Sequence, residues 1–182
     1  LVLAPELVVA GARPAPGPVV VSADDHYSLA AVLAELLARE GREVLYVASS
    51  DGVASWSAHT AEQSLTWARL AELGVRFLLH HGVAGLTGET LELACLRSGG
   101  GQRMSVAGLV TVTSREPDDA LWRALSAREH GLATLVRAGD CEAPGLIAQA
   151  VWHGHRVARE FLAEVPAAGR ERPVVGGQLP TP

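Results

Sequence analysis

The chain has 182 residues, of which 48% are hydrophobic and 19% are charged, and its formal net charge is −5. This composition is typical of a globular protein with a sizeable core and excludes a disordered chain. The acidic balance, with no basic run, disfavours a nucleic-acid surface, and no apolar run is long enough to span a membrane. Two widely spaced cysteines, with neither a metal-ligand spacing nor a visible signal peptide, favour a reduced cytoplasmic setting.

The beginning of the chain has two unusual features. It starts at Leu1, and its single methionine is Met104, which predicts a processed, split or truncated piece of a longer protein. Residues 1–17 then combine a short apolar run with a Pro/Gly/Ala-rich stretch. That composition predicts a semi-extended linker that leads into the first strand.

Residues 19–48 have the pattern of a strand, a helix and a second strand. Three successive valines open the run, and leucine and valine residues then recur at helical spacing. Gly41 is placed to end the helix, after which residues 44–47 return as a strand. This order is typical of the opening βαβ unit of a dinucleotide-binding fold, in which a glycine-rich turn holds a pyrophosphate.

The turn after the first strand lacks those glycines. Their positions are occupied by Ala23, Asp25 and Ser28, with Asp24 between them. A phosphate about 4 Å from a carboxylate is repelled by roughly 4 kcal/mol at an effective dielectric constant near 20. We therefore expect a closed dinucleotide turn in which Asp24 or Asp25 complements the helix N-terminus in place of a phosphate. A plain N-cap role for Asp24 explains the same residues.

The middle of the chain predicts a change from parallel to antiparallel strands. Residues 60–63 fit a capping box for a helix that ends at Gly74, and residues 75–79 form the next strand. Two strand-like runs flank a glycine-rich tip at residues 98–102, which predicts an antiparallel segment. Residues 109–112 then read as a central apolar strand.

The last third predicts a helix from about Pro117, a strand at residues 132–136 and a long helix at residues 143–163. The tail from Pro166 is rich in proline and glycine and has too little apolar periodicity for a regular element. It suits an arm that lies across a partner. The fold class expected for the whole chain is α/β, with a Rossmann-like parallel sheet flanked by helices and an antiparallel β segment.

A glycine–aspartate pair, Gly139-Asp140, lies between the predicted strand and the last helix. Ligands of open α/β sheets bind at the carboxyl edge of the strands, and the Asp140 carboxylate suits hydrogen bonds from ribose or ribityl hydroxyls. The N–H groups of residues 143–145 suit an anion, and Pro144 is compatible with a first helical turn. The alternative is that Asp140 only caps the helix.

The histidines give weaker signals. His80 and His81 are adjacent on a predicted strand end and point to opposite faces, which disfavours a shared metal ion. His153 and His155 lie two apart in a helix and face different sides, so surface or domain contacts are favoured over catalysis.

The run GDCEAPGLIAQAVWHGHRVARE at residues 139–160 is similar to the closing motif of the trimethylamine dehydrogenase and 2,4-dienoyl-CoA reductase family, iron–sulfur flavoproteins of the Old Yellow Enzyme superfamily. Shorter matches occur in the same order along the chain: Leu3-x-Pro5-Glu6, Ala23-Asp24-x-x-Tyr27, His59-Thr60-x-Glu62 and Leu121-Trp122-x-x-Leu125. The resemblance covers nearly the whole chain and is stronger to the amine-dehydrogenase branch.

The resemblance implies a division of the chain within a glutathione-reductase-type arrangement. Residues 1–17 are a linker, and residues 18–103 are an inserted NAD(P)-type domain with a degenerate glycine turn. Residues 104–163 are the closing part of an FAD- or ADP-type domain, and residues 164–182 are an extended tail. The barrel that carries FMN and a 4Fe–4S cluster in this family has no counterpart in the chain, and two cysteines cannot supply the four thiolates of a cluster.

The resemblance also implies half of a nucleotide site, for FAD or ADP. Its cofactor-binding residues are Gly139, Asp140, Ala143, Pro144 and Arg115, and the other half is supplied by a partner segment. Ser114 stands where the family has a glycine, which weakens the expectation of close cofactor approach there.

Three functions are compatible with these expectations. In the first, the chain is a non-catalytic nucleotide-domain subunit or fragment of a hetero-oligomeric amine dehydrogenase or enoate reductase, bound to a flavin/iron–sulfur barrel subunit or to a missing N-terminal portion. In the second, it is a purely structural assembly subunit that binds no nucleotide. The third, a self-sufficient NAD(P)-dependent reductase, is disfavoured by the turn at residues 23–28.

Overall fold

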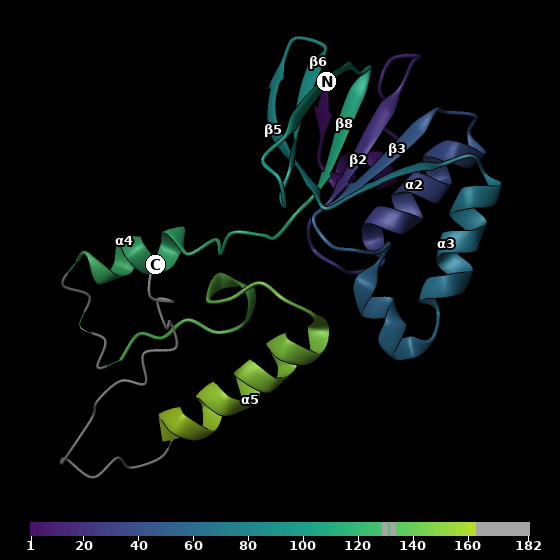
Figure 1. The fold of residues 1–182 in the computed structure, drawn as a ribbon. Helices are drawn as coiled ribbons and strands as arrows, with labels where there is room; N and C mark the ends of the chain where they lie inside the picture. Colours follow the sequence, from purple (N-terminus) through teal and green to yellow (C-terminus); the bar gives the residue numbers. More distant parts are fainter. Residues whose placement is uncertain (129–130, 132–133, 163–182) are drawn as a thin grey trace. The chain divides into compact units, whose positions relative to one another are not determined.

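The computed structural model describes residues 1–128, 131 and 134–162. The chain divides into two compact units, Leu1–Ser114 and Arg115–Pro182 (Figure 1). Within the described residues, no helix is both long enough and apolar enough to cross a membrane.

A five-stranded parallel sheet forms the centre of the first unit. Its strands, in spatial order, are β1 (Val2–Leu3), β8 (Gly108–Val112), β2 (Val19–Ala23), β3 (Val44–Ala48) and β4 (Arg76–Leu79). Every neighbouring pair is parallel. The predicted α/β class is therefore confirmed, and the strand at residues 109–112 lies inside the sheet, between β1 and β2.

Helices and a β meander cover the sheet (Figure 1). The helical elements of this unit are α1 (Pro5–Val9), α2 (Leu29–Arg39), the 3-10 helix η1 (Ser55–Thr60) and α3 (Gln63–Glu72). The antiparallel meander consists of β5 (His81–Thr87), β6 (Thr90–Cys95) and β7 (Gly101–Ser105). The predicted hairpin around the glycine tip is β6–β7. Strand β5 is additional, and its register shifts between Val83 and Gly85.

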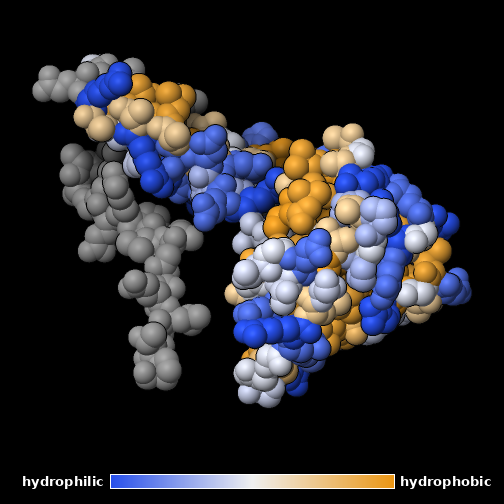
Figure 2. Space-filling view, turned by 90° about the horizontal axis from the view of Figure 1, so that it is seen from above, coloured by the Kyte–Doolittle hydropathy of each residue, from blue (hydrophilic) through white to orange (hydrophobic). Residues whose placement is uncertain are grey.

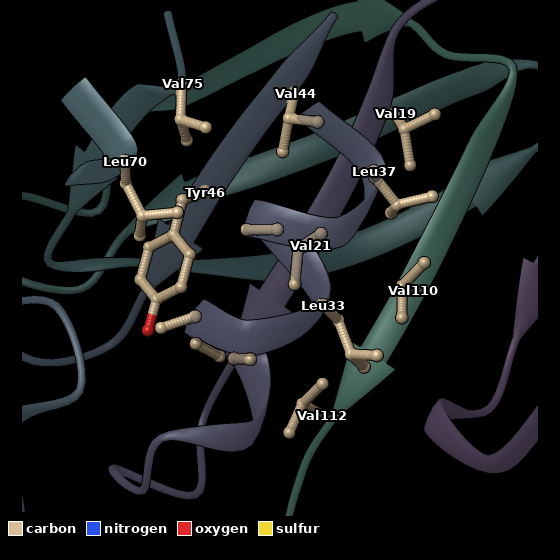
Figure 3. Close-up of a cluster of buried hydrophobic side chains, with 14 of the residues drawn as sticks. Val19, Val21, Leu33, Leu37, Val44, Tyr46, Leu70, Val75, Val110 and Val112 are labelled. Atoms are coloured by element: carbon tan, nitrogen blue, oxygen red, sulfur yellow. The ribbon is translucent and has the colours of Figure 1, made fainter. Parts of the chain in front are cut away.

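The alternation of side chains along β2 explains why the sheet is covered on both faces. Val19 and Val21 belong to the larger apolar cluster, in which Leu33 and Leu37 of α2 pack against the sheet (Figure 3). Val20 points the other way and belongs to a second cluster, with residues of the meander. Because successive strand residues face opposite sides, one continuous valine run serves both clusters.

Tyr46 is the largest fully buried side chain of the first unit and is 1% exposed. Its hydroxyl accepts a hydrogen bond from the Ala54 N–H at 3.3 Å, which satisfies the polar tip of the ring. Burial raises the pKa of Tyr46 to about 12. The tyrosine therefore remains a neutral core residue.

The N-terminal region is not the linker that its composition predicts. Strand β1 pairs with β8, and α1 follows it with Val8 fully buried. Arg13 then forms an ion pair with Glu40, with N···O distances of 2.6 and 2.7 Å. The prediction failed because a two-residue strand and a five-residue helix are too short to show periodicity.

Two further local predictions need correction. Helix α3 begins at Gln63 after Glu62, and no side chain caps it. Thr60 bonds the Glu62 carboxylate at 2.6 Å and Gln63 donates to the Val53 carbonyl at 3.0 Å, so the predicted capping box does not form. Moreover, β8 pairs with β2 and the first unit ends at Ser114, not at the predicted boundary after residue 103.

The second unit contains α4 (Ala120–Ser126), the 3-10 turn η2 (Gly139–Cys141) and α5 (Ile147–Leu162). Both helices start later than the sequence predicts, and residues 134–136 do not form the predicted strand. Residues 132–133, residue 163 and the predicted arm from Pro166 lie outside the described residues. Among the described residues of this unit, no hydrophobic side chain is buried.

Candidate nucleotide turn

The turn between β2 and α2 is occupied by its own side chains and backbone groups. Asp25 accepts a hydrogen bond from the Tyr27 N–H at 3.2 Å, and His26 has a φ of 62°. The backbone N–H of Trp56, in η1, donates to the His26 carbonyl at 3.0 Å, and the Trp56 ring packs edge-on against Tyr27 with 5.9 Å between ring centroids. Burial raises the pKa of the Asp25 carboxyl. These contacts support the expectation of a closed turn.

Neither aspartate caps α2, which corrects the predicted detail. The N-cap residue is Ser28, and it makes no side-chain cap hydrogen bond. Asp25 instead forms a turn with the N–H two residues ahead, before the helix begins. Asp24 donates its backbone N–H to the Val112 carbonyl at 2.9 Å, which extends the β2–β8 pairing.

The Gly139-Asp140 pair lies in the single turn η2. Gly139 has a φ of 68°, a conformation that glycine adopts without strain and other residues rarely adopt. Its carbonyl accepts hydrogen bonds from the N–H groups of Glu142 and Ala143, both at 3.0 Å. Its own N–H donates to Nδ1 of His153 in α5 at 3.3 Å. Asp140 follows directly and is exposed.

Three of the five predicted site residues share this turn, namely Gly139, Asp140 and Ala143. Because the Ala143 N–H is bonded to the Gly139 carbonyl, it is already committed within the turn. Pro144 precedes the helix rather than opening it, since α5 begins at Ile147. Arg115 lies outside the turn, on the exposed segment that follows β8.

The start of α5 has a partner that the sequence analysis overlooked. Gln149 accepts a hydrogen bond from the Leu146 N–H at 2.5 Å through Oε1. This bond satisfies one of the donors that a helix start leaves open. A Gln three residues after the helix entry is the back half of a capping box, which is the signal that could have located it.

A cluster of charged side chains, which the sequence analysis also missed, links α4 to the glycine turn. Arg137 bonds Oδ2 of Asp119 at 2.6 Å and Oε2 of Glu142 at 2.6 Å, and its guanidinium lies 4.6 Å from the centroid of the Trp122 ring. Arg123 also pairs with Asp119, at 2.8 Å. The hydrogen bond from Arg123, followed by the charges of Arg123 and Arg137, lowers the pKa of Asp119.

The cysteines and paired histidines do not assemble into a metal centre. Cys95 lies in the first unit and Cys141 in the second, and the described residues contain no group of three His, Cys, Asp or Glu side chains placed to hold a metal ion. Hydrogen bonds from the Ser98 hydroxyl and from the backbone N–H groups of Ser98 and Arg97 lower the pKa of Cys95 to about 7. His81 bonds the Leu79 carbonyl through Nδ1 at 2.6 Å.

Large hydrophobic side chains are exposed along α5. Ile147 is 85% exposed and Trp152 is 63% exposed, and Val151 and Phe161 are also exposed. Figure 2 shows hydrophobic surface on this second unit. Ala150, His153 and Val157 are half-buried, and His153 lies on the side of the helix away from Val151. The helix thus has one face that contacts its own unit and another that lacks cover among the described residues.

No protein-family model matches the chain. The sequence is 31% identical over 184 residues to the dimethylamine dehydrogenase of Hyphomicrobium sp. (strain x). The match covers 88% of this chain and 25% of that protein. The fold is similar to histamine dehydrogenase from Rhizobium sp. 4-9, with a TM-score of 0.80, 33% identity, and coverage of 98% of this chain and 29% of that chain.

A second solved structure agrees with the first. The 6-hydroxypseudooxynicotine amine oxidase (HisD) from Pseudomonas geniculata N1 aligns with a TM-score of 0.77 and 30% identity, over 89% of this chain and 24% of that chain. These similarities show that the chain is an α/β protein homologous to amine-oxidising enzymes. The chain is homologous to one part of these enzymes of the trimethylamine dehydrogenase family, as the sequence motifs indicate, and it spans about a quarter of their length.

Proposed function

We propose that this chain is the nucleotide-domain part, whether subunit or fragment, of a trimethylamine-dehydrogenase-like oxidoreductase. In this proposal it supplies one half of an ADP or FAD site and braces a barrel that carries FMN and a 4Fe–4S cluster. The carrying observation is the similarity of 88–98% of this chain to a quarter or slightly more of two amine dehydrogenases. Oxidation of an amine, or reduction of an enoyl compound, then takes place at a flavin outside this chain.

The geometry of the glycine turn supports the nucleotide role. Gly139 sets the direction of the backbone, and Asp140, the middle residue of the turn, presents an exposed carboxylate. A carboxylate has two acceptor oxygens and suits the paired hydroxyls of a ribose or ribityl group. Because the Ala143 N–H is used inside the turn, hydroxyl recognition suits this turn better than a grip on phosphate. Arg115 and Pro144 are assigned supporting contacts on the nucleotide.

The cofactors of such an enzyme divide between this chain and the rest of the protein. A 4Fe–4S cluster needs four thiolates, and the chain has two cysteines, Cys95 and Cys141, so its residues do not fit a cluster. The closed turn after β2 does not fit a pyrophosphate. The Gly139-Asp140 turn does fit the hydroxyls of a nucleotide, and FMN is assigned to the barrel.

The exposed face of α5 supports the bracing role. A surface helix in a globular protein normally places its apolar stripe against a core, and contiguous exposed apolar residues mark an interaction surface. Ile147, Val151 and Trp152 are exposed instead. In the proposal, the remainder of the nucleotide domain covers them, supplied by a partner chain or by another segment of the same protein.

Titration with ADP and with FAD tests the nucleotide role, in the complete protein or complex that contains this chain. We expect Asp140→Ala to weaken binding about tenfold or more, since a hydrogen bond to a charged group contributes roughly 1.5–3 kcal/mol. The matched control is Asp51→Ala, which removes an exposed carboxylate from the first unit. Absence of saturable binding by the wild-type protein contradicts the proposal.

A second function, a purely structural assembly subunit, is favoured by one observation. The turn that normally binds a pyrophosphate is filled, while the apolar face of α5 is available for docking. The titration with ADP and FAD distinguishes the two functions. An assembly subunit binds neither nucleotide, yet still fails to assemble when Trp152 is replaced by a charged residue.

A further inference from the structure

The backbone at Gly139 is anchored on both sides of the residue. The carbonyl of Gly139 accepts two N–H donors, from Glu142 and Ala143, at 3.0 Å each. The N–H of Gly139 donates to His153 Nδ1 at 3.3 Å. The first two bonds close the turn upon itself, whereas the third ties it to α5, fourteen residues further along the chain.

The bond to His153 requires one state of the imidazole ring. A backbone N–H only donates, so Nδ1 must present its lone pair and the ring proton must lie on Nε2. His153 is half-buried on the side of α5 that faces the turn, together with Ala150 and Val157. The side chain is therefore part of the contact between α5 and η2 rather than a surface histidine.

Arg137 holds the other end of the same turn. It bonds Glu142 at 2.6 Å and Asp119 at 2.6 Å, so the residue that donates to the Gly139 carbonyl is itself tied to α4. The turn has two external ties, one to each helix of the unit. Arg137 reaches the turn through the side chain of Glu142. Only His153 bonds directly to the backbone of Gly139, the residue before Asp140.

We propose that His153 is a positioning residue of the nucleotide site, which accepts the Gly139 N–H at Nδ1 and thereby fixes the direction of the Asp140 carboxylate. This inference rests on the proposed function. Glycine at a φ of 68° has wide conformational freedom, and rotation there redirects the residue that follows. The hydrogen bond to α5 removes that freedom, so the carboxylate meets the nucleotide hydroxyls without an ordering cost at binding.

Three substitutions at His153 test this positioning role, because each places the acceptor atom differently. Asn places an acceptor oxygen close to the position of Nδ1, Gln places one close to Nε2, and Ala removes both. In the complete protein, titrated with ADP, we expect His153→Ala and His153→Gln to weaken binding about fivefold to tenfold, the usual effect of one hydrogen bond. We expect His153→Asn to retain affinity within about twofold. Thermal unfolding of each variant identifies any that fails to fold.

A second measurement does not depend on nucleotide. NMR of the protein labelled with ¹⁵N-histidine is expected to show the Nε2–H tautomer of His153, with an unprotonated Nδ1. An Nδ1–H tautomer, or equal ADP affinity in all three variants while Asp140→Ala loses affinity, overturns the inference alone. A wild-type protein that does not bind ADP overturns the proposed function, and the positioning role with it.

Discussion

The two units of this chain differ in where their apolar side chains lie. In the first unit, the β2 valines, the α2 leucines and Tyr46 are buried on the two faces of one sheet. In the second, the described residues bury Asp119 but no hydrophobic side chain, and α5 exposes Ile147, Trp152 and Phe161. A unit that buries its apolar surface can be stable by itself, whereas one that exposes it depends on cover from elsewhere. The comparison supports the proposal that the first unit is self-sufficient and that other parts of the protein cover the second.

The largest expected effect tests the self-sufficiency of the first unit. Leu33 is 1% exposed, and Leu33→Ala removes its contacts with the sheet, so we expect a loss of about 2–5 kcal/mol in the free energy of unfolding. Val32, on the same helix, is 56% exposed, and Val32→Ala should change the same quantity by less than about 0.5 kcal/mol. Urea denaturation of both variants provides the measurement. Equal losses would contradict the assignment of the core.

The second expected effect is on association rather than on the free energy of unfolding. Because Trp152 is exposed, Trp152→Asp should change the free energy of unfolding of the chain by less than about 0.5 kcal/mol. If the proposed bracing role holds, it should weaken association with the proposed remaining parts of the protein about tenfold or more. Analytical ultracentrifugation with the remaining parts measures the association. Leu65→Asp on α3, which is 68% exposed on the first unit, is the matched control and should leave the association unchanged. Equal weakening by both variants would remove the distinction between the units.

The smallest expected effect concerns the charged cluster of the second unit. Arg137→Ala removes one of the two arginines that lower the pKa of Asp119, so we expect that pKa to rise toward its ordinary value near about 4. A carboxyl whose folded pKa is depressed stabilises the fold fully above its unfolded pKa, and that contribution is lost as the pH falls through the folded pKa. The variant should therefore lose less stability on acidification than the wild type does.

An NMR titration of the Asp119 carboxyl measures this change. Arg76→Ala removes an exposed pair with Glu43 in the first unit and serves as the control, since it should not alter the Asp119 titration. An unchanged pKa in Arg137→Ala would contradict this prediction, because it would mean that Arg123 alone lowers the pKa of Asp119.

Several features of the fold could be predicted because each depends on a local pattern. The valine run at β2, the leucine spacing of α2 and the glycine tip between β6 and β7 all formed the expected elements. Strand β5 was missed because Gly82 and Gly85 interrupt its apolar pattern. The predicted strand at residues 132–136 is absent at residues 134–136, since a strand needs a neighbour and this unit contains no sheet among its described residues.

The candidate site shows the same limit. The sequence singled out Gly139 and Asp140 through their order and motif and favoured surface or domain contacts for His153, but it did not indicate that His153 contacts Gly139. Arg137 was not predicted either, because its partner Asp119 lies 18 residues earlier in the chain. Contacts over such separations depend on how the chain folds back, and no spacing rule reports them.

By itself, the sequence determined the α/β class, the loss of the glycine-rich turn and the relation to amine dehydrogenases, because these depend on residue type and order along the chain. Only the tertiary structure decided that the N-terminal region adds a strand to the sheet, that β8 belongs to the first unit and that His153 contacts Gly139. The physical reason is that strand pairing and side-chain contacts join residues distant in sequence, and burial is defined only once they meet.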